Sequence, residues 1–106
     1  MVNRHRGEIE ACLDGRSFTL CLTLGALAEL EHAFGADDMV MLAERFGSGR
    51  MKAHDAIRII GAGLRGAGHD LEDATVARMQ VDGGAAGFVA LVAELLTVTF
   101  GTSSQA

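Results

Sequence analysis

A chain of 106 residues, with 49% hydrophobic and 22% charged residues, has the length and composition of one small globular domain. Its net charge of −5 and its lack of tryptophan and tyrosine argue against a nucleic-acid binder, which normally presents a basic face and aromatic stacking platforms. The sequence contains no apolar run near the ~20 residues of a transmembrane helix and no evident signal peptide, so we expect a cytoplasmic protein that does not bind membranes. We expect residues 1–106 to form a single domain, ordered from about residue 6 to residue 101 and frayed at both ends.

The clearest local signal is a β-hairpin in "GEIEACLDGRSFTLCLT", residues 7–23. Two alternating runs flank Asp14-Gly15, a dipeptide that suits a type I′ turn because both positions need a positive φ. With Leu13 opposite Arg16, one face of the hairpin collects the apolar side chains of Ile9, Ala11, Leu13, Phe18, Leu20 and Leu22. A two-stranded hairpin is not stable alone, so this face must pack on the helices that follow.

From Thr23 the apolar period becomes helical. Thr23 is predicted to cap a helix that ends at Gly35 and whose inner side chains are Leu24, Leu27, Leu30 and Phe34. Asp37 or Asp38 is predicted to start a shorter helix that ends at Gly47 and whose inner side chains are Met39, Leu42, Ala43 and Phe46. The "GSGR" that follows, residues 47–50, indicates a flexible joint.

The stretch "AIRIIGAGLRGAGHD", residues 56–70, contains a literal G-x-G-x-x-G. This spelling marks a dinucleotide site only where a buried strand enters the glycines and a helix leaves them. The apolar residues before the glycines instead recur with helical spacing, in a helix that starts near Met51 and carries Ile57, Ile60, Gly61 and Leu64. We therefore predict that the motif binds no nucleotide, that Gly61 permits close packing, and that Gly66 and Gly68 end the helix.

Two further helices complete the predicted fold, which is α+β with the hairpin packed on four to five helices. Asp70 is predicted to cap a short helix over "LEDATVARMQ", residues 71–80, with Asp73 at its N3 position. Asp82 is predicted to cap the last and most apolar helix, whose inner side chains are Phe88, Leu91, Val92, Leu95 and Val98, with Phe100 at its end.

No residue pattern in the chain indicates catalysis, a cofactor or a metal. In the hairpin register Cys12 pairs with Ser17 and Cys21 with Glu8, which puts the two cysteine Cα atoms ~13 Å apart at ~3.4 Å per residue, too far for a disulfide. The histidines have no ligand-like spacing with these two thiols. Nucleophile-elbow, H-E-x-x-H and Walker motifs are all missing from the sequence, so we predict a protein that is not an enzyme.

The order of these motifs along the chain resembles that of a known protein family. The chain contains "RGEIEACLDGRSFTLCLTLGALAELEHAFGADDMVMLAERF", then "IRIIGAGLRGAGHD", then "DGGAAGFVALVAELLTVTFG". Over residues 4–101 this series resembles the gene transfer agent family of small tail proteins, which is similar to the tail assembly chaperones of long-tailed phages. The most specific parts are "LTLGALAELE", "AGLRGAGHD" and the closing "TFG".

The resemblance implies a chaperone that binds the helical tape-measure protein, keeps it soluble, helps to recruit tail tube subunits, and then leaves the particle. Such a protein needs an apolar patch or groove that a helix can enter. We predict this partner-binding surface at Met39, Met41, Phe46 and Met51, because adaptable methionines cluster there beside the glycine joint. The alternative is that these methionines fill gaps in the core.

The resemblance also allows a structural role in the finished tail, associated with the tube. A tube subunit would form rings through a large β-sandwich with long pairing strands, which one hairpin and a few helices cannot build. A helix-turn-helix regulator is disfavoured because no predicted recognition helix is basic. The predicted helical content therefore favours the chaperone role.

Overall fold

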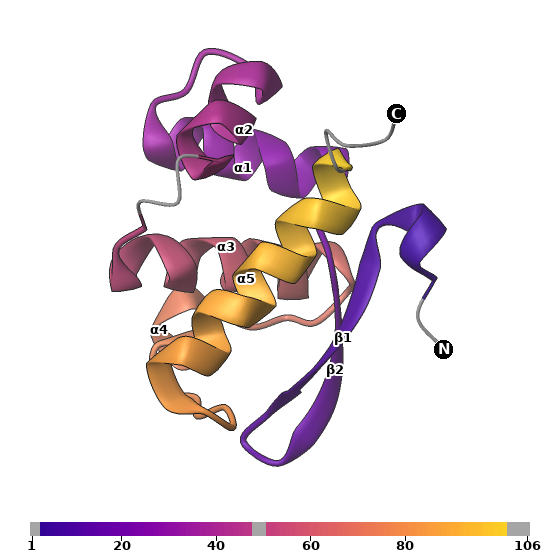
Figure 1. The fold of residues 1–106 in the computed structure, drawn as a ribbon, viewed down its shortest axis with the longest axis vertical. Coiled ribbons are helices and arrows are strands. Elements are labelled where there is room, and N and C mark those ends of the chain that lie inside the picture. The colour runs from indigo at the N-terminus through magenta and orange to yellow at the C-terminus, as the bar shows by residue number, and fades with distance from the viewer. Residues whose placement is uncertain (1–2, 48–50, 102–106) are drawn as a thin grey trace.

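The computed structural model describes residues 3–47 and 51–101. Within these residues, a short 3₁₀ turn and a two-stranded antiparallel hairpin precede five α-helices, which confirms the predicted α+β class (Figure 1). The elements are η1 (Arg4–Arg6), β1 (Glu8–Leu13), β2 (Arg16–Cys21), α1 (Leu24–Phe34), α2 (Met39–Gly47), α3 (Ala53–Gly66), α4 (Asp73–Val76) and α5 (Gly84–Phe100).

The hairpin has the predicted turn and register. Asp14 and Gly15 have φ angles of 54° and 75°, as a type I′ turn requires, and Leu13 pairs with Arg16. Every side chain of the predicted apolar face is buried, namely Ile9, Ala11, Leu13, Phe18, Leu20 and Leu22. The alternation of apolar and polar residues was therefore sufficient to identify the face that joins the core.

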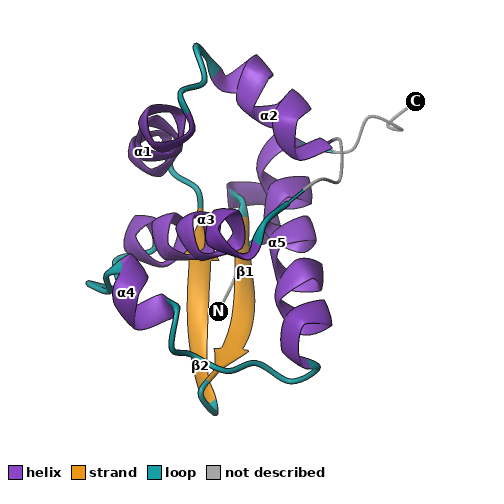
Figure 2. Cartoon of the chain, turned by 90° about the vertical axis from the view of Figure 1, so that its left-hand side faces the viewer, coloured by secondary structure: helices purple, strands orange, loops and turns teal. Residues whose placement is uncertain are grey.

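Two helices cover the buried face of the hairpin. α3 packs mainly on β2 and α5 on β1, and the two helices also contact each other. α1 and α4 pack on α3, and α2 packs on α1 and α5. Figure 2 shows α3 crossing in front of the hairpin, with α4 and α5 on either side of the strands. The apolar faces of the helices meet the hairpin in one cluster, to which α5 contributes the predicted residues Leu91, Val92 and Leu95.

α1 begins and ends where the sequence predicts. The Thr23 hydroxyl accepts a hydrogen bond from the Ala26 backbone N–H at 3.1 Å, and Gly35 ends the helix in the left-handed conformation. The prediction that Leu24 faces inward is wrong, since this side chain is 75% exposed. Ala26 is buried in its place, because α3 comes close to α1 at Gly66 and Ala26 packs there.

α4 is shorter than predicted and is not capped by Asp70. The helix spans Asp73–Val76, and the turns after it use i→i+3 hydrogen bonds such as Met79 N–H to the Val76 carbonyl, 3.0 Å. Gln80 then exchanges two 2.8 Å hydrogen bonds with Asp14 at the hairpin turn. Because these bonds draw the chain toward the hairpin, a helix cannot continue to residue 80.

α5 also starts differently from the prediction. Asp82 does not cap it, and the helix begins at Gly84 after Gly83, which occupies the cap position without a side-chain hydrogen bond. Gly83 and Gly84 both have positive φ, 90° and 59°, a pair of conformations that glycine adopts at little cost. The backbone of Asp82 then lies so close to Gly87 that a Cβ there would overlap the Asp82 carbonyl oxygen.

Candidate functional site

α2 presents an apolar turn to solvent. Asp38 caps the helix, because its Oδ1 accepts a hydrogen bond from the Met41 backbone N–H at 2.9 Å. Met39, Val40 and Met41 are 43%, 66% and 46% exposed, and we term these three residues the α2 patch. The prediction that Met39 faces the core is wrong, since its side chain is exposed. Leu42, one turn later, is fully buried, so the edge of the core lies between these two residues.

The rest of α2 is attached to the body of the protein. Leu42 inserts into the core, and the Arg45 guanidinium lies over the Phe34 ring of α1 at 5.0 Å from the ring centroid. A cation–π contact of this kind contributes about 0.5–1 kcal/mol at an exposed site. The α2 patch is therefore displayed by a packed helix.

A second apolar feature is a groove of about 360 Å³ between the start of α3, α4 and the start of α5. These three segments lie on the left-hand side of the molecule in Figure 1, the side that faces the viewer in Figure 2. Val89, on one wall, is 59% exposed. We term this feature the α3–α5 groove, and its lining residues are Met51, Lys52, Ala53, Ala56, Ile57, Ile60, Val76, Ala77, Ala85, Phe88 and Val89.

The predicted partner-binding residues divide between these two features. Met39 and Met41 belong to the α2 patch, whereas Met51 is half-buried and lines the α3–α5 groove. Phe46 is in α2, but its side chain lies outside the described part of the structure, as does residue range 48–50 of the predicted joint. Met51 follows Gly47, the last residue of α2, by four positions. The Cα atom of Gly47 therefore lies within about 15 Å of that of Met51, which lines the groove.

The glycines of the G-x-G-x-x-G lie within α3, as predicted, and their role is packing. A Cβ on Gly63 would lie 2.9 Å from Leu95 Cδ2 and 3.3 Å from Leu20 Cβ. A Cβ on Gly66 would overlap the carbonyl oxygen of Cys21 on β2. The glycines therefore let α3 approach the hairpin and α5 more closely than alanines would.

A comparison with protein families identifies the chain. The family model described as "Phage tail tube protein, GTA-gp10" matches residues 6–102. The chain belongs to this family. The match extends from Arg6, the last residue of η1, through the hairpin and helices α1 to α5, and the family is a phage tail assembly chaperone-like family. No curated protein and no solved structure matched the chain.

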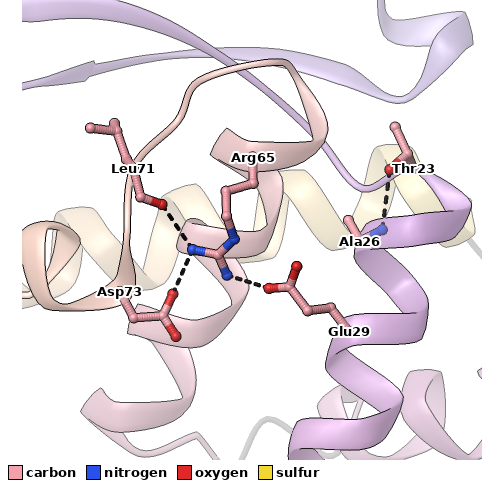
Figure 3. Close-up of polar contacts among 6 residues, drawn as sticks. All are labelled: Thr23, Ala26, Glu29, Arg65, Leu71 and Asp73. Atoms are coloured by element: carbon pink, nitrogen blue, oxygen red, sulfur yellow. Dashed lines mark hydrogen bonds and ion pairs between the residues drawn. The ribbon is translucent and has the colours of Figure 1, made fainter.

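In this member of the family, Arg65 of α3 joins α1 to the segment that leads into α4 (Figure 3). Its Nη1 donates to the Leu71 carbonyl at 2.9 Å and to Asp73 Oδ1 at 3.0 Å, and its Nη2 donates to Glu29 Oε1. The hydrogen bond with Glu29 is the main cause that raises the pKa of Arg65 above its ordinary value, with Asp73 adding to the effect and partial burial opposing it. The guanidinium thus ties α1 to the segment that carries α4, one wall of the groove.

Local sequence signals could not reveal the groove or the Arg65 cluster. Glu29 and Arg65 are 36 positions apart, and only the fold brings them together. Val89 follows the correctly predicted Phe88 on α5, yet the helical period assigns it to the solvent side. A valine outside the predicted core face of α5 was the sequence signal for this wall of the groove.

Both cysteines of the chain lie within the described residues. Cys12 and Cys21 are free, and burial together with the nearby Glu8 carboxylate raises the pKa of the Cys21 thiol. Within residues 3–47 and 51–101, no group of three or more His, Cys, Asp and Glu side chains is arranged to hold a metal ion. Across the same residues, no helix combines the length and apolar character needed to span a bilayer.

Proposed function

We propose that this member of the GTA-gp10 family is a cytoplasmic tail assembly chaperone that binds the tape-measure protein before the tail is complete. The α2 patch carries the proposal, because three consecutive apolar side chains lie exposed on a helix of a protein from a tail assembly family. Exposed apolar clusters on soluble proteins mark binding surfaces, and methionine side chains adapt to varied partners.

The chemistry of the partner fits these surfaces. A tape-measure protein is a long helical chain whose apolar faces are uncovered until the tube forms around it, and such faces bind in apolar grooves and patches. The net charge of −5 keeps the complex soluble while the apolar surfaces are engaged. Tail tube subunits are the second partner, recruited to the covered tape-measure protein.

A second candidate is a structural role in the tail, which the family description as a tail tube protein favours. The fold supports this role less well. A tube ring needs long strands that pair between neighbouring subunits, whereas the strands in the described residues are one hairpin of two six-residue strands.

Co-expression with the tape-measure protein of the same tail gene cluster tests the proposal. We expect the wild type to co-purify with it and Met41→Asp to co-purify far less. The matched control is Leu24→Asp, because Leu24 is also an exposed apolar residue in the first turn of a capped helix, where an acidic side chain favours helix formation. If the wild type does not co-purify with the tape-measure protein, the proposal is wrong.

A further inference from the structure

We propose that the α3–α5 groove binds one helical segment of the partner and selects it by two large apolar side chains one turn apart, with an acidic residue beside them. The inference rests on the proposed function for the identity of the partner, the tape-measure protein. It adds the place on this chain where the partner is held and the chemistry of the segment that fits there.

The volume of the groove sets the number of side chains. An apolar protein cavity of about 150 Å³ holds one benzene ring. The groove, at about 360 Å³, therefore has room for two side chains of the size of leucine or phenylalanine. On a helix, two side chains reach the same groove when they are three or four positions apart.

The walls favour a helix as the occupant. Small side chains line the groove from α3 (Ala56), from the residue after α4 (Ala77) and from α5 (Ala85), so a partner backbone can come close. Phe88 and Ile57 are half-buried against the core and offer larger apolar contacts. An apolar recess between helices, entered by side chains at i and i+4, is a common way in which proteins bind an amphipathic helix.

Charge favours an acidic residue of the partner beside Lys52. Among the described residues that line the groove, Lys52 is the one that carries a charge. The nearby Asp55 is buried, and its carboxylate accepts a hydrogen bond from the Lys52 backbone N–H at 3.2 Å. The exposed charge at the Lys52 end of the groove is thus positive, whereas the chain as a whole has a net charge of −5. An acidic residue of the partner is therefore attracted to Lys52 and repelled by most of the remaining surface.

Binding of overlapping 20-residue peptides from the tape-measure protein, measured by fluorescence anisotropy, tests the inference. We expect the tightest peptides to contain the predicted pattern, and Val89→Asp to weaken their binding at least about tenfold, because a charge replaces an exposed apolar wall. Leu24→Asp should bind as the wild type does. Lys52→Glu should weaken binding about two- to fivefold at low salt, and replacing the partner's acidic residue with lysine should restore it.

The outcomes separate the inference from the proposed function. If the intact tape-measure protein co-purifies with Val89→Asp as well as with the wild type, and the peptides bind both equally, the groove is not the site and the chaperone role stands. If Lys52→Glu leaves the affinity unchanged, the charge rule is wrong. If neither the tape-measure protein nor any peptide binds the wild type, the proposed function fails, and the inference fails with it. Equal far-ultraviolet circular dichroism of all variants confirms that each is folded.

Discussion

Gly66→Ala tests whether the glycines of α3 serve packing. The added methyl group would overlap the Cys21 carbonyl oxygen and lie 3.3 Å from Ala26 Cβ, so it meets β2 and α1 at once. Backbone atoms cannot rotate away as a flexible side chain can, and α3 must therefore shift away from the hairpin. The neighbouring residues on α3 are buried, so such a shift also loosens the core.

The size of the effect follows from two opposing terms. Overpacking a tight site costs about 1–3 kcal/mol, and contact with backbone places this site near the upper end of that range. Alanine is a better helix former than glycine by at most about 1 kcal/mol, which offsets part of the cost. We expect a net loss of about 2 kcal/mol, equivalent to a melting temperature lower by about 8–16 °C in a domain of this size.

Urea denaturation of Gly66→Ala beside Gly25→Ala measures this difference. Gly25 is the matched control, because a Cβ there finds its nearest neighbour, Thr23 Oγ1, at 3.9 Å. Gly25→Ala should therefore be neutral or stabilising by up to about 1 kcal/mol. A Gly66→Ala variant as stable as Gly25→Ala would show that α3 does not need the glycine for close packing, and our explanation of the motif would be wrong.

Three further predictions concern the core, the thiols and the motif. Leu91→Ala should lower the free energy of unfolding by about 2–5 kcal/mol, whereas Leu24→Ala should change it by less than about 0.5 kcal/mol. A melting temperature of Leu91→Ala unchanged within about a degree would place that face of α5 outside the core. A maleimide at pH 8 should label Cys12 before Cys21, because the raised pKa of Cys21 lowers its thiolate fraction and Cys12 is more exposed; the reverse order in peptide mapping would contradict this. NAD or ATP in large excess should leave the melting temperature unchanged, and a concentration-dependent rise would restore the nucleotide hypothesis.

The hairpin and the helix order could be predicted from the sequence because their signals are local. Asp14-Gly15 fixes the turn, and the alternation around it fixes which side chains are buried. Thr23 and Gly35 likewise mark the two ends of α1 within one turn of the chain. Each of these features depends on residues a few positions apart, which is the range that propensity and periodicity describe.

The errors arise where distant segments decide the local structure. Asp70 does not start a helix, because the segment that follows is bound by Arg65 and then drawn to Asp14, 66 positions before Gln80. Leu24 lies outside because Ala26 is the residue that fits against Gly66 of α3. A helical period gives no information about such long-range contacts.

The candidate site was predictable only in part, for the same reason. The cluster of methionines drew attention to Met39 and Met41, which the structure places on an exposed turn, but their exposure depends on where the core ends beside Leu42. Met51 lines a groove whose other walls come from α4 and α5, between 25 and 38 positions further along the chain. The sequence indicated which residue types form these apolar surfaces. The shape of the groove depends on contacts between distant segments, which only the fold shows.

We propose that this protein assists assembly and then leaves the particle. The most direct test is quantitative mass spectrometry of purified particles, with the amount of this chain compared with that of the main tail tube subunit. We expect near absence from mature particles, together with a complex between this protein and the tape-measure protein in extracts of producing cells. Many copies per tail in purified particles would contradict the chaperone role and would establish a structural component of the tail.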